Sequence, residues 1–292
     1  MNPQTMQLEH VLPAHNDLGE GPLWHPGEDA LYLVDIHGKK IQRYHPESKD
    51  YQIFPMPMKV TALALREQGG FVIASDTGFH FWDPATGEIS FIAHPEAGKA
   101  GARFNDGKVD RAGRFWAGTM EPTSATSALY RLDADGSLQR METGITISNG
   151  IGWSPDNSTM YYVDSLRYTI YAYDFDLASG AIRNQRDLAR YEPAFGIPDG
   201  LTVDSQGHLW VAFYDGWKVA RINPTGNITA IIDFPVARVT SCAFGGRNLD
   251  ELYVTTAIDS LSEHERQAQP LAGDLFRVKT GVTGIPEPSF IG

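Results

Sequence analysis

Side chains with oxygen atoms recur at the first position of a repeated sequence pattern. An acid, amide or hydroxyl residue is followed by a short apolar run, a turn and a second apolar run, as in residues 199–212. The six first positions are Glu20, Thr61, Asn105, Asn149, Asp199 and Thr240. Two carboxylates and two amide oxygens that converge need a cation among them, and such donors favour Ca²⁺, Mg²⁺ or Mn²⁺ over structural zinc. The pattern therefore predicts a divalent cation site.

Each of these positions also has a structural interpretation. Asn149-Gly150 and Asp199-Gly200 are dipeptides typical of turns, and Glu20 is compatible with a solvated loop. The cation site is favoured because these acids and amides occupy the same position in each repeat. Independent turns would have no reason to place them there.

The repeats that carry these residues start roughly 40 to 50 residues apart and show only strand patterns. A period of this length is typical of a β-propeller with one four-stranded blade per repeat, whose innermost strands line a central channel. We expect an all-β, six-bladed propeller that forms one domain over residues 1–292. Equivalent first positions should then form a ring at one end of the channel.

The sixth repeat lacks one strand. It has strand patterns at 252–256 and 275–279 but no fourth run, while residues 8–12 form a lone strand pattern ahead of the first repeat. We expect residues 8–12 to close the last blade and remove its open edge. Only residues 262–267 have the pattern of a short helix.

Composition limits the classes of partner and location. The net charge of −12 without a run of Lys or Arg argues against nucleic acid and anionic membranes. No apolar stretch approaches the ~18 residues of a membrane span, and the N-terminus does not read as a signal peptide. The single cysteine, Cys242, excludes an internal disulfide and is expected to be a buried thiol in a cytoplasmic protein. The sequence predicts a monomer or a weak homo-oligomer.

Several motifs together resemble the senescence marker protein/gluconolactonase/luciferin-regenerating enzyme family over nearly the whole chain. They are Leu18-Gly19-Glu20-Gly21-Pro22, Val34-Asp35-Ile36, Arg103-Phe104-Asn105-Asp106-Gly107-Lys108, Gly118-Thr119-Met120, Ser148-Asn149-Gly150, Pro198-Asp199-Gly200 and Pro270-Leu271-Ala272-Gly273. This resemblance implies a six-bladed propeller with one divalent cation in its channel. The sequence does not choose among Ca, Mn, Mg, Zn and Fe.

The resemblance also implies roles for six residues. The metal ligands are expected to be Glu20, Asn149 and Asp199, with Asp199 also the general base. The substrate contacts are expected to be Arg103, Asn105 and Glu121. Strand alternation predicts that Asp106 points away from the channel axis. The histidines show no ligand spacing and are not expected to bind the metal, and Tyr214 fits either the rim or blade packing.

These residue types suit the hydrolysis of a sugar lactone, a pentono- or hexonolactone, to its aldonic acid. A divalent ion polarises the carbonyl and activates water, a carboxylate accepts the proton, and Arg, Asn and Glu bind sugar hydroxyls. An organophosphate or aryl ester hydrolase could use the same metal site. A non-catalytic calcium-binding or protein-interaction propeller is the third interpretation, but it gives Arg103-Phe104-Asn105 no role.

Overall fold

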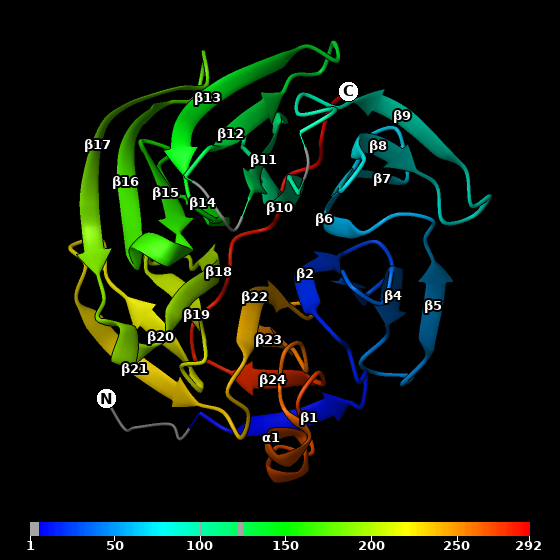
Figure 1. Cartoon of the computed structure of the whole chain (residues 1–292), viewed down its shortest axis with the longest axis vertical. Helices are drawn as coiled ribbons and strands as arrows, with labels where there is room; N and C mark the ends of the chain where they lie inside the picture. The colour runs from blue at the N-terminus through cyan, green and yellow to red at the C-terminus, as the bar shows by residue number, and fades with distance from the viewer. Residues whose placement is uncertain (1–5, 100, 122–124) are drawn as a thin grey trace.

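The computed structural model describes residues 6–99, 101–121 and 125–292. Its strands form six four-stranded antiparallel sheets arranged around a central axis (Figure 1). The predicted six-bladed propeller is therefore confirmed.

The first three blades each follow the chain from the innermost to the outermost strand. Blade 1 contains β2 (Gly19–His25), β3 (Ala30–Asp35), β4 (Lys40–Tyr44) and β5 (Tyr51–Pro55). Blade 2 contains β6 (Val60–Leu65), β7 (Phe71–Ser75), β8 (Gly78–Trp82) and β9 (Ile89–Ala93). Blade 3 contains β10 (Arg103–Val109), β11 (Phe115–Met120), β12 (Ser127–Leu132) and β13 (Leu138–Ile145).

The next two blades repeat this order, and the sixth departs from it at the outer edge. Blade 4 contains β14 (Ser148–Trp153), β15 (Thr159–Asp164), β16 (Thr169–Asp176) and β17 (Ala181–Arg190). Blade 5 contains β18 (Ile197–Val203), β19 (Leu209–Tyr214), β20 (Lys218–Ile222) and β21 (Ile228–Asp233). Blade 6 contains β22 (Val239–Gly245), β23 (Glu251–Thr256), β24 (Leu275–Lys279) and β1 (Leu8–Leu12). Short helices are η1 (Ser165–Arg167), η2 (Pro193–Phe195) and α1 (Glu263–Ala268).

The hydrophobic core lies between neighbouring blades, because both faces of each small sheet are apolar. Tyr32 of blade 1 and Phe71 of blade 2 have ring centroids 4.7 Å apart, and Trp210 and Phe244 join blades 5 and 6 at 6.1 Å. Cys242 is buried in the same interface, and burial raises the pKa of its thiol to about 12. The buried-thiol prediction is confirmed.

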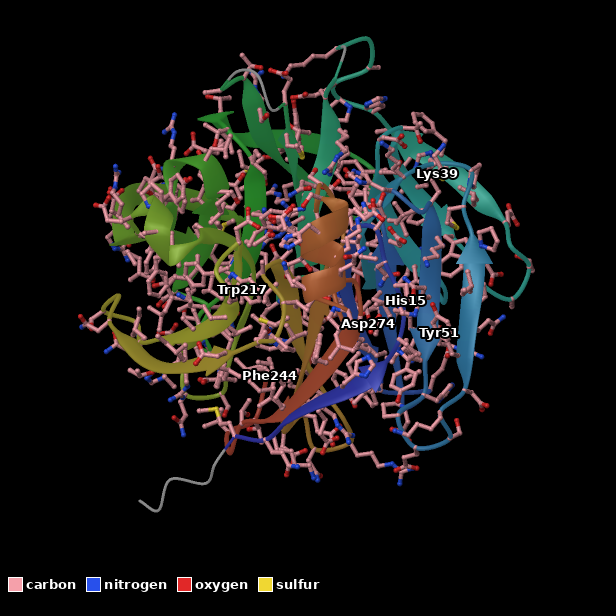
Figure 2. All side chains as sticks on the ribbon, turned by 60° about the horizontal axis from the view of Figure 1, so that its bottom comes forward. His15, Lys39, Tyr51, Trp217, Phe244 and Asp274 are labelled. Atoms are coloured by element: carbon pink, nitrogen blue, oxygen red, sulfur yellow. The ribbon has the colours of Figure 1, made fainter. Side chains whose placement is uncertain are left out.

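The N-terminal strand closes the ring as predicted, since β1 pairs antiparallel with β24. A buried carboxylate reinforces this pairing: Asp274 accepts from the backbone N–H of His15 at 3.0 Å, and its Oδ2 lies 2.8 Å from His10 Nε2. Figure 2 shows His15 beside Asp274. The short helix α1 also forms near its predicted place, with Ser262 as a capping-box residue.

A bulge interrupts the innermost strand of every blade at or next to the first position of the repeat. The register shifts lie at Glu20/Leu23, Val60/Ala62, Phe104/Gly107, Asn149/Ile151, Pro198/Leu201 and Val239/Ser241. A bulge leaves a residue outside the ladder and turns its side chain in a new direction. The six bulges therefore form a layer around the channel in which ordinary strand alternation does not hold.

The C-terminal segment, residues 280–292, crosses one end of the ring, which we call the tail end (Figure 1). Backbone hydrogen bonds tie it to Leu249 of blade 6, Ser205 of blade 5, Gly113 of blade 3 and Leu65 of blade 2. The segment thus joins four blades across the channel. Among the described residues, no helix is long and apolar enough to cross a membrane.

Candidate functional site

The opposite end of the channel, which we call the site end, is where the inner strands begin. It contains a pocket with a volume of about 200 Å³. The lining residues come from the inner strands and from the loops around them: Leu18, Glu20, Arg103, Asn105, Met120, Ile147, Asn149, Ser165, Leu166, Ile197, Asp199, Tyr214 and Asp259. Five of the six residues predicted for the site are therefore brought together.

Glu121 is the predicted residue outside this lining set. It directly follows β11 and is half-buried, and residues 122–124 beyond it lie outside the described residues. The nearest lining residue in sequence is Met120, the last residue of that strand. The predicted contact between Glu121 and substrate stays a prediction.

The amide of Asn149 is held in one orientation by a short chain of hydrogen bonds. Its Nδ2 donates to Ser165 Oγ at 2.9 Å, and Ser165 Oγ donates to the carbonyl of Pro198 at 2.7 Å. This fixes the amide oxygen on the other side, where Asn149 Oδ1 is buried and has no hydrogen-bond partner. A buried polar atom without a partner is costly, so this oxygen is suited to a ligand that supplies positive charge.

The carboxylates of Glu20 and Asp199 are buried beside it, with exposed fractions of 8% and 6%. Asp199 Oδ1 also lacks a hydrogen-bond partner, and Glu20 Oε2 accepts from the backbone N–H of Gly21 at 3.1 Å. Burial raises the pKa of Glu20 to about 8, and the nearby Asp106 adds to the rise. Burial and the charge of Glu20 raise the pKa of Asp199 well above its usual range. A cation among these oxygens would offset both causes.

The turn interpretation of Asn149-Gly150 and Asp199-Gly200 is wrong, because both pairs lie inside the innermost strands β14 and β18. The glycines serve close packing around the channel. A Cβ atom on Gly150 would lie 2.7 Å from the carbonyl oxygen of Asp199. The absence of a Cβ atom at Gly150 therefore allows β14 and β18 to pack closely beside the channel.

Arg103 and Asn105 lie side by side on β10 and are linked to each other. Arg103 Nη1 donates to Asn105 Oδ1 at 2.6 Å, and Asn105 Nδ2 donates to the carbonyl of Ser148 at 2.7 Å. The amide oxygen of Asn105 is therefore occupied by Arg103, whereas that of Asn149 has no partner. Burial lowers the pKa of Arg103 to about 10, against the opposing charges of Glu20 and other acids. At neutral pH the guanidinium is a half-buried cation in the pocket wall.

The six first positions of the repeat fall into two groups: side chains whose oxygens are occupied by hydrogen bonds within the protein, and side chains whose oxygens remain available to a ligand. Thr61 Oγ1 donates to the carbonyl of Ala74 at 3.2 Å, and Thr240 Oγ1 donates to the carbonyl of Gly19 at 2.5 Å. These hydroxyls support the inner strands and are not among the pocket-lining residues. The remaining open oxygen donors are those of Glu20, Asn149 and Asp199.

The expected direction of Asp106 is wrong. Asp106 lines a second cavity inside the channel, together with residues from the other five inner strands such as Leu63, Ile151 and Ser241. The reason is the bulge between Phe104 and Gly107, which breaks the alternation on which the expectation was based. Asp106 lies on the tail side of the ring and is not part of the pocket at the site end.

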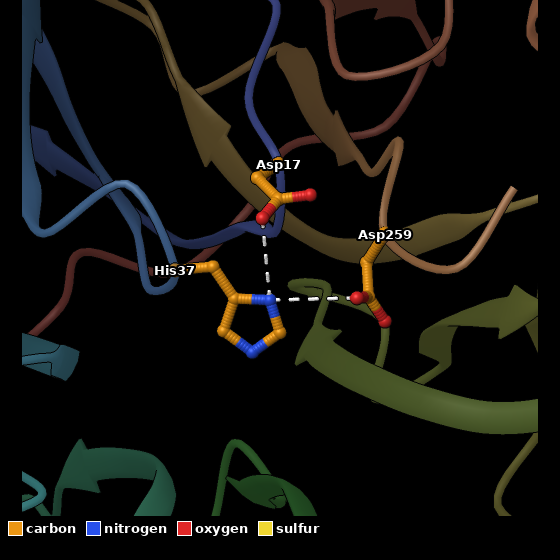
Figure 3. Close-up of side chains that lie close together, drawn as sticks. All are labelled: Asp17, His37 and Asp259. Atoms are coloured by element: carbon orange, nitrogen blue, oxygen red, sulfur yellow. Dashed lines mark ion pairs between the residues drawn. The ribbon is translucent and has the colours of Figure 1, made fainter.

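Loops at the rim bring in residues that the repeat pattern did not identify. Ser165 and Asp259 line the pocket, and Tyr214 occupies the rim and not only a packing position. Figure 3 shows His37 between two carboxylates: its Nδ1 is 3.5 Å from Asp17 Oδ2 and 3.4 Å from Asp259 Oδ1. These three residues could also hold a metal ion. The sequence signal for Ser165, Tyr214 and Asp259 is that residues 165–168, 214–217 and 257–270 follow strand patterns, where rim loops that set specificity are expected.

Comparisons with known proteins agree with this architecture. Regucalcin from Oryctolagus cuniculus is 40% identical over 99% of both chains. A solved luciferin-regenerating enzyme is 32% identical and superimposes with a TM-score of 0.91 over 98% of this chain and 100% of that chain. A calcium-binding protein, regucalcin from Agrobacterium tumefaciens, is 28% identical with a TM-score of 0.94 over 98% of this chain and 97% of that chain.

The family model described as "SMP-30/Gluconolactonase/LRE-like region" matches residues 18–258. This range contains the five pocket residues that the sequence predicted, and the similarity to regucalcin extends over nearly the full length. The chain belongs to the SMP-30/gluconolactonase/LRE-like family.

Proposed function

We propose that the protein is a divalent-metal-dependent hydrolase that opens a sugar lactone, a pentono- or hexonolactone, to its aldonic acid. The observation that carries the proposal is the pair of buried oxygens, Asn149 Oδ1 and Asp199 Oδ1, that face the pocket without partners. Glu20 and Arg103 share that pocket. Membership of a family that includes gluconolactonases supports this choice of reaction.

The donor set fits a metal ion of the hard, oxygen-preferring class. Glu20, Asn149 and Asp199 would hold it through carboxylate and amide oxygens, a set that suits Ca²⁺, Mn²⁺ or Mg²⁺ and also accepts Zn²⁺ or Fe²⁺. When bound, the ion supplies Lewis acidity to the lactone carbonyl and lowers the pKa of water. The A. tumefaciens relative is described as calcium-binding, which favours a divalent ion here.

Asp199 is the general base of the proposed reaction. One oxygen of its carboxylate accepts a proton from the attacking water, whose oxygen forms the new bond to the carbonyl carbon. The ring C–O bond then breaks, and the leaving alkoxide takes up a proton to become a hydroxyl of the aldonic acid. Such proton transfer typically contributes ~10²–10⁴ in rate.

Arg103 and Asn105 orient the substrate in this proposal. The guanidinium is held by Asn105 and by the carbonyl of Phe104 at 2.8 Å, so its remaining N–H groups have a fixed direction. A fixed donor can hydrogen-bond a lactone oxygen or a sugar hydroxyl with defined geometry. Glu121 is proposed to contact a further hydroxyl. A cytoplasmic location, one domain over residues 1–292 and a monomeric or weakly oligomeric state stay predictions from the sequence.

The test is a pH-indicator assay on a panel of pentono- and hexonolactones, with an aryl ester and an organophosphate triester as competing substrates. Protein is stripped with a chelator and assayed with and without Ca²⁺, Mn²⁺, Mg²⁺ and Zn²⁺. We expect metal-dependent turnover of at least one sugar lactone. Turnover of the ester or triester alone would replace the lactonase by the alternative hydrolase. Metal binding without turnover of any substrate would favour the non-catalytic calcium-binding propeller.

A further inference from the structure

One wall of the pocket carries a carboxylate that the proposed reaction does not use. Asp259 follows β23 in a rim loop, and its side chain is 28% exposed. It lines the same pocket as Glu20, Asp199 and Arg103. Tyr214, at the end of β19, is its neighbour in that wall.

Contacts at the rim fix the position of Asp259 without saturating its carboxylate. Its Oδ2 accepts from Ser260 Oγ at 3.1 Å and, weakly, from Tyr214 Oη at 3.5 Å. Its Oδ1 faces His37 Nδ1 at 3.4 Å. A carboxylate has about four lone-pair sites, so these mostly long contacts leave room for a further hydroxyl donor.

The loop itself is held by backbone bonds that do not involve the carboxylate. The N–H of Asp259 donates to the carbonyl of Asp17 at 2.7 Å, and the N–H of Ile258 donates to the same carbonyl at 2.9 Å. On the other side, the guanidinium of Arg238 lies 5.0 Å from the ring centroid of Tyr214. Changing the side-chain chemistry of Asp259 should therefore leave the loop in place.

The charges of the pocket favour a neutral ligand in this wall. The described lining residues include three acids, Glu20, Asp199 and Asp259, and one base, Arg103. A divalent cation offsets the charges of Glu20 and Asp199, which leaves Arg103 and Asp259. Arg103 Nη1 is already occupied by the carbonyl of Phe104 at 2.8 Å and by Asn105 Oδ1 at 2.6 Å. A phosphate or carboxylate next to Asp259 would meet a like charge.

We propose that Asp259, positioned by Tyr214, is a specificity-determining residue that selects lactones with a neutral, hydroxyl-bearing substituent over lactones that carry a phosphate or carboxylate. The carboxylate accepts a hydrogen bond from a substrate hydroxyl, and the same charge disfavours an anionic group at that place. This inference rests on the proposed lactonase activity and adds to it the class of substrate.

The experiment compares a neutral δ-hexonolactone with the same lactone phosphorylated on its terminal hydroxyl, using metal-loaded protein. We expect the wild type to prefer the neutral lactone in kcat/KM by roughly tenfold or more. Asp259→Asn keeps the shape and removes the charge. It should raise KM for the neutral lactone by roughly three- to tenfold and lower KM for the phosphorylated one, with kcat little changed.

Two further variants separate positioning from general effects. Tyr214→Phe removes the hydroxyl that orients Asp259 and should shift the selectivity ratio in the same direction by a smaller factor. Asp187→Asn is the matched control, since Asp187 lies 49% exposed on β17, paired with Arg190 and outside the pocket lining. It removes the same charge and should leave the ratio unchanged.

The outcomes distinguish this inference from the function on which it rests. If the wild type hydrolyses both lactones with equal kcat/KM, or if Asp259→Asn leaves the ratio unchanged, the specificity role is overturned and the lactonase stands. An equal shift in Asp187→Asn would also overturn it, because the effect would then be one of net charge. If folded, metal-loaded wild type hydrolyses none of the pentono- and hexonolactones of the panel, the proposed function itself fails.

Discussion

Both ends of the channel contain charged residues, but the charged groups differ in whether they have hydrogen-bond or ion-pair partners. At the tail end, Asp106 accepts from the N–H of Gly107 at 2.9 Å, and Lys108 Nζ lies 3.0 Å from Glu287 of the C-terminal segment. At the site end, buried oxygens of Asn149 and Asp199 have no partner. Paired charges fill a structural role, whereas unpaired buried oxygens indicate a place for a ligand. We therefore expect changes at the tail end to alter stability and changes at the site end to alter turnover.

The largest effect on stability is expected for Phe290→Ala at the tail end. Phe290 is 1% exposed in the core between blades 2 and 3, and its backbone pairs with Leu65 at 2.8 Å. Truncating a buried Phe costs about 3–5 kcal/mol in the free energy of unfolding. Denaturant unfolding measures this loss, while the affinity for the metal should be unchanged at a temperature where the variant is folded. The exposed neighbour Ile291→Ala is the control. A large loss of metal affinity in Phe290→Ala alone would show that the two ends are not independent.

The largest effect on turnover is expected for Asp199→Asn at the site end. Asn keeps an oxygen ligand of similar size but cannot accept the proton of water at neutral pH. The value of kcat should fall by a factor on the order of 10² or more, with the melting temperature little changed. Metal content is measured on the same sample. Near-normal turnover with metal bound would assign the base elsewhere, with Glu20 and Glu121 the next candidates.

Metal binding should change the pH dependence of stability through Glu20. Without metal, the folded protein holds a proton at Glu20 up to about pH 8, whereas the unfolded chain releases it near the ordinary pKa of 4.5. The folded state then binds more protons, so stability falls as pH rises through this window, by at most ~1.4 kcal/mol per pH unit for each such proton. Bound metal keeps the carboxylate charged in the folded state and should flatten the slope.

Melting temperatures measured from pH 5 to 8, with chelator and with metal, check this expectation. Glu20→Gln removes the titrating group and should flatten the chelator curve in part. Identical pH profiles with and without metal would mean that the cation does not bind at Glu20.

The smallest effect is expected for Lys108→Met at the tail end. The ion pair of Lys108 and Glu287 is about 20% exposed on each side, so water screens part of its attraction. Its loss should cost about 1 kcal/mol or less in the free energy of unfolding. Glu287→Gln and the double variant complete the cycle that isolates the pair. If Lys108→Met instead lowered kcat as much as Asp199→Asn, the tail end would also take part in catalysis and the expected separation of the two ends would be wrong.

The sequence predicted the fold well because each blade repeats and the missing strand of the last repeat was visible. Residues 8–12 could be assigned to the closing edge for that reason, and β1 occupies that place. The direction of Asp106 could not be predicted, since a bulge shifts register without a residue type that marks it. At the corresponding bulges of blades 4 and 5, a glycine follows Asn149 and Asp199. A glycine alone does not indicate a bulge, because it fits a turn equally well.

The pocket residues divide in the same way. Glu20, Asn105, Asn149 and Asp199 lie at first positions of the repeat, so the repeat identifies them, whereas Arg103 was predicted from the family resemblance. Ser165 begins η1, Tyr214 ends β19 and Asp259 lies in the loop after β23, and no local sequence pattern specifies that these three segments meet at one pocket. The hydroxyls of Thr61 and Thr240 donate to backbone carbonyls of neighbouring strands. The repeat pattern does not show this, so it could not separate these two positions from the predicted metal ligands.

We propose that lactone hydrolysis requires one divalent cation at the site end. The most direct test measures metal content and turnover of a sugar lactone on the same sample, first after chelation and then during stepwise return of the metal. We predict that turnover disappears with the metal and returns in proportion to occupancy, saturating at one ion per chain. Full turnover in a verified metal-free sample would contradict it.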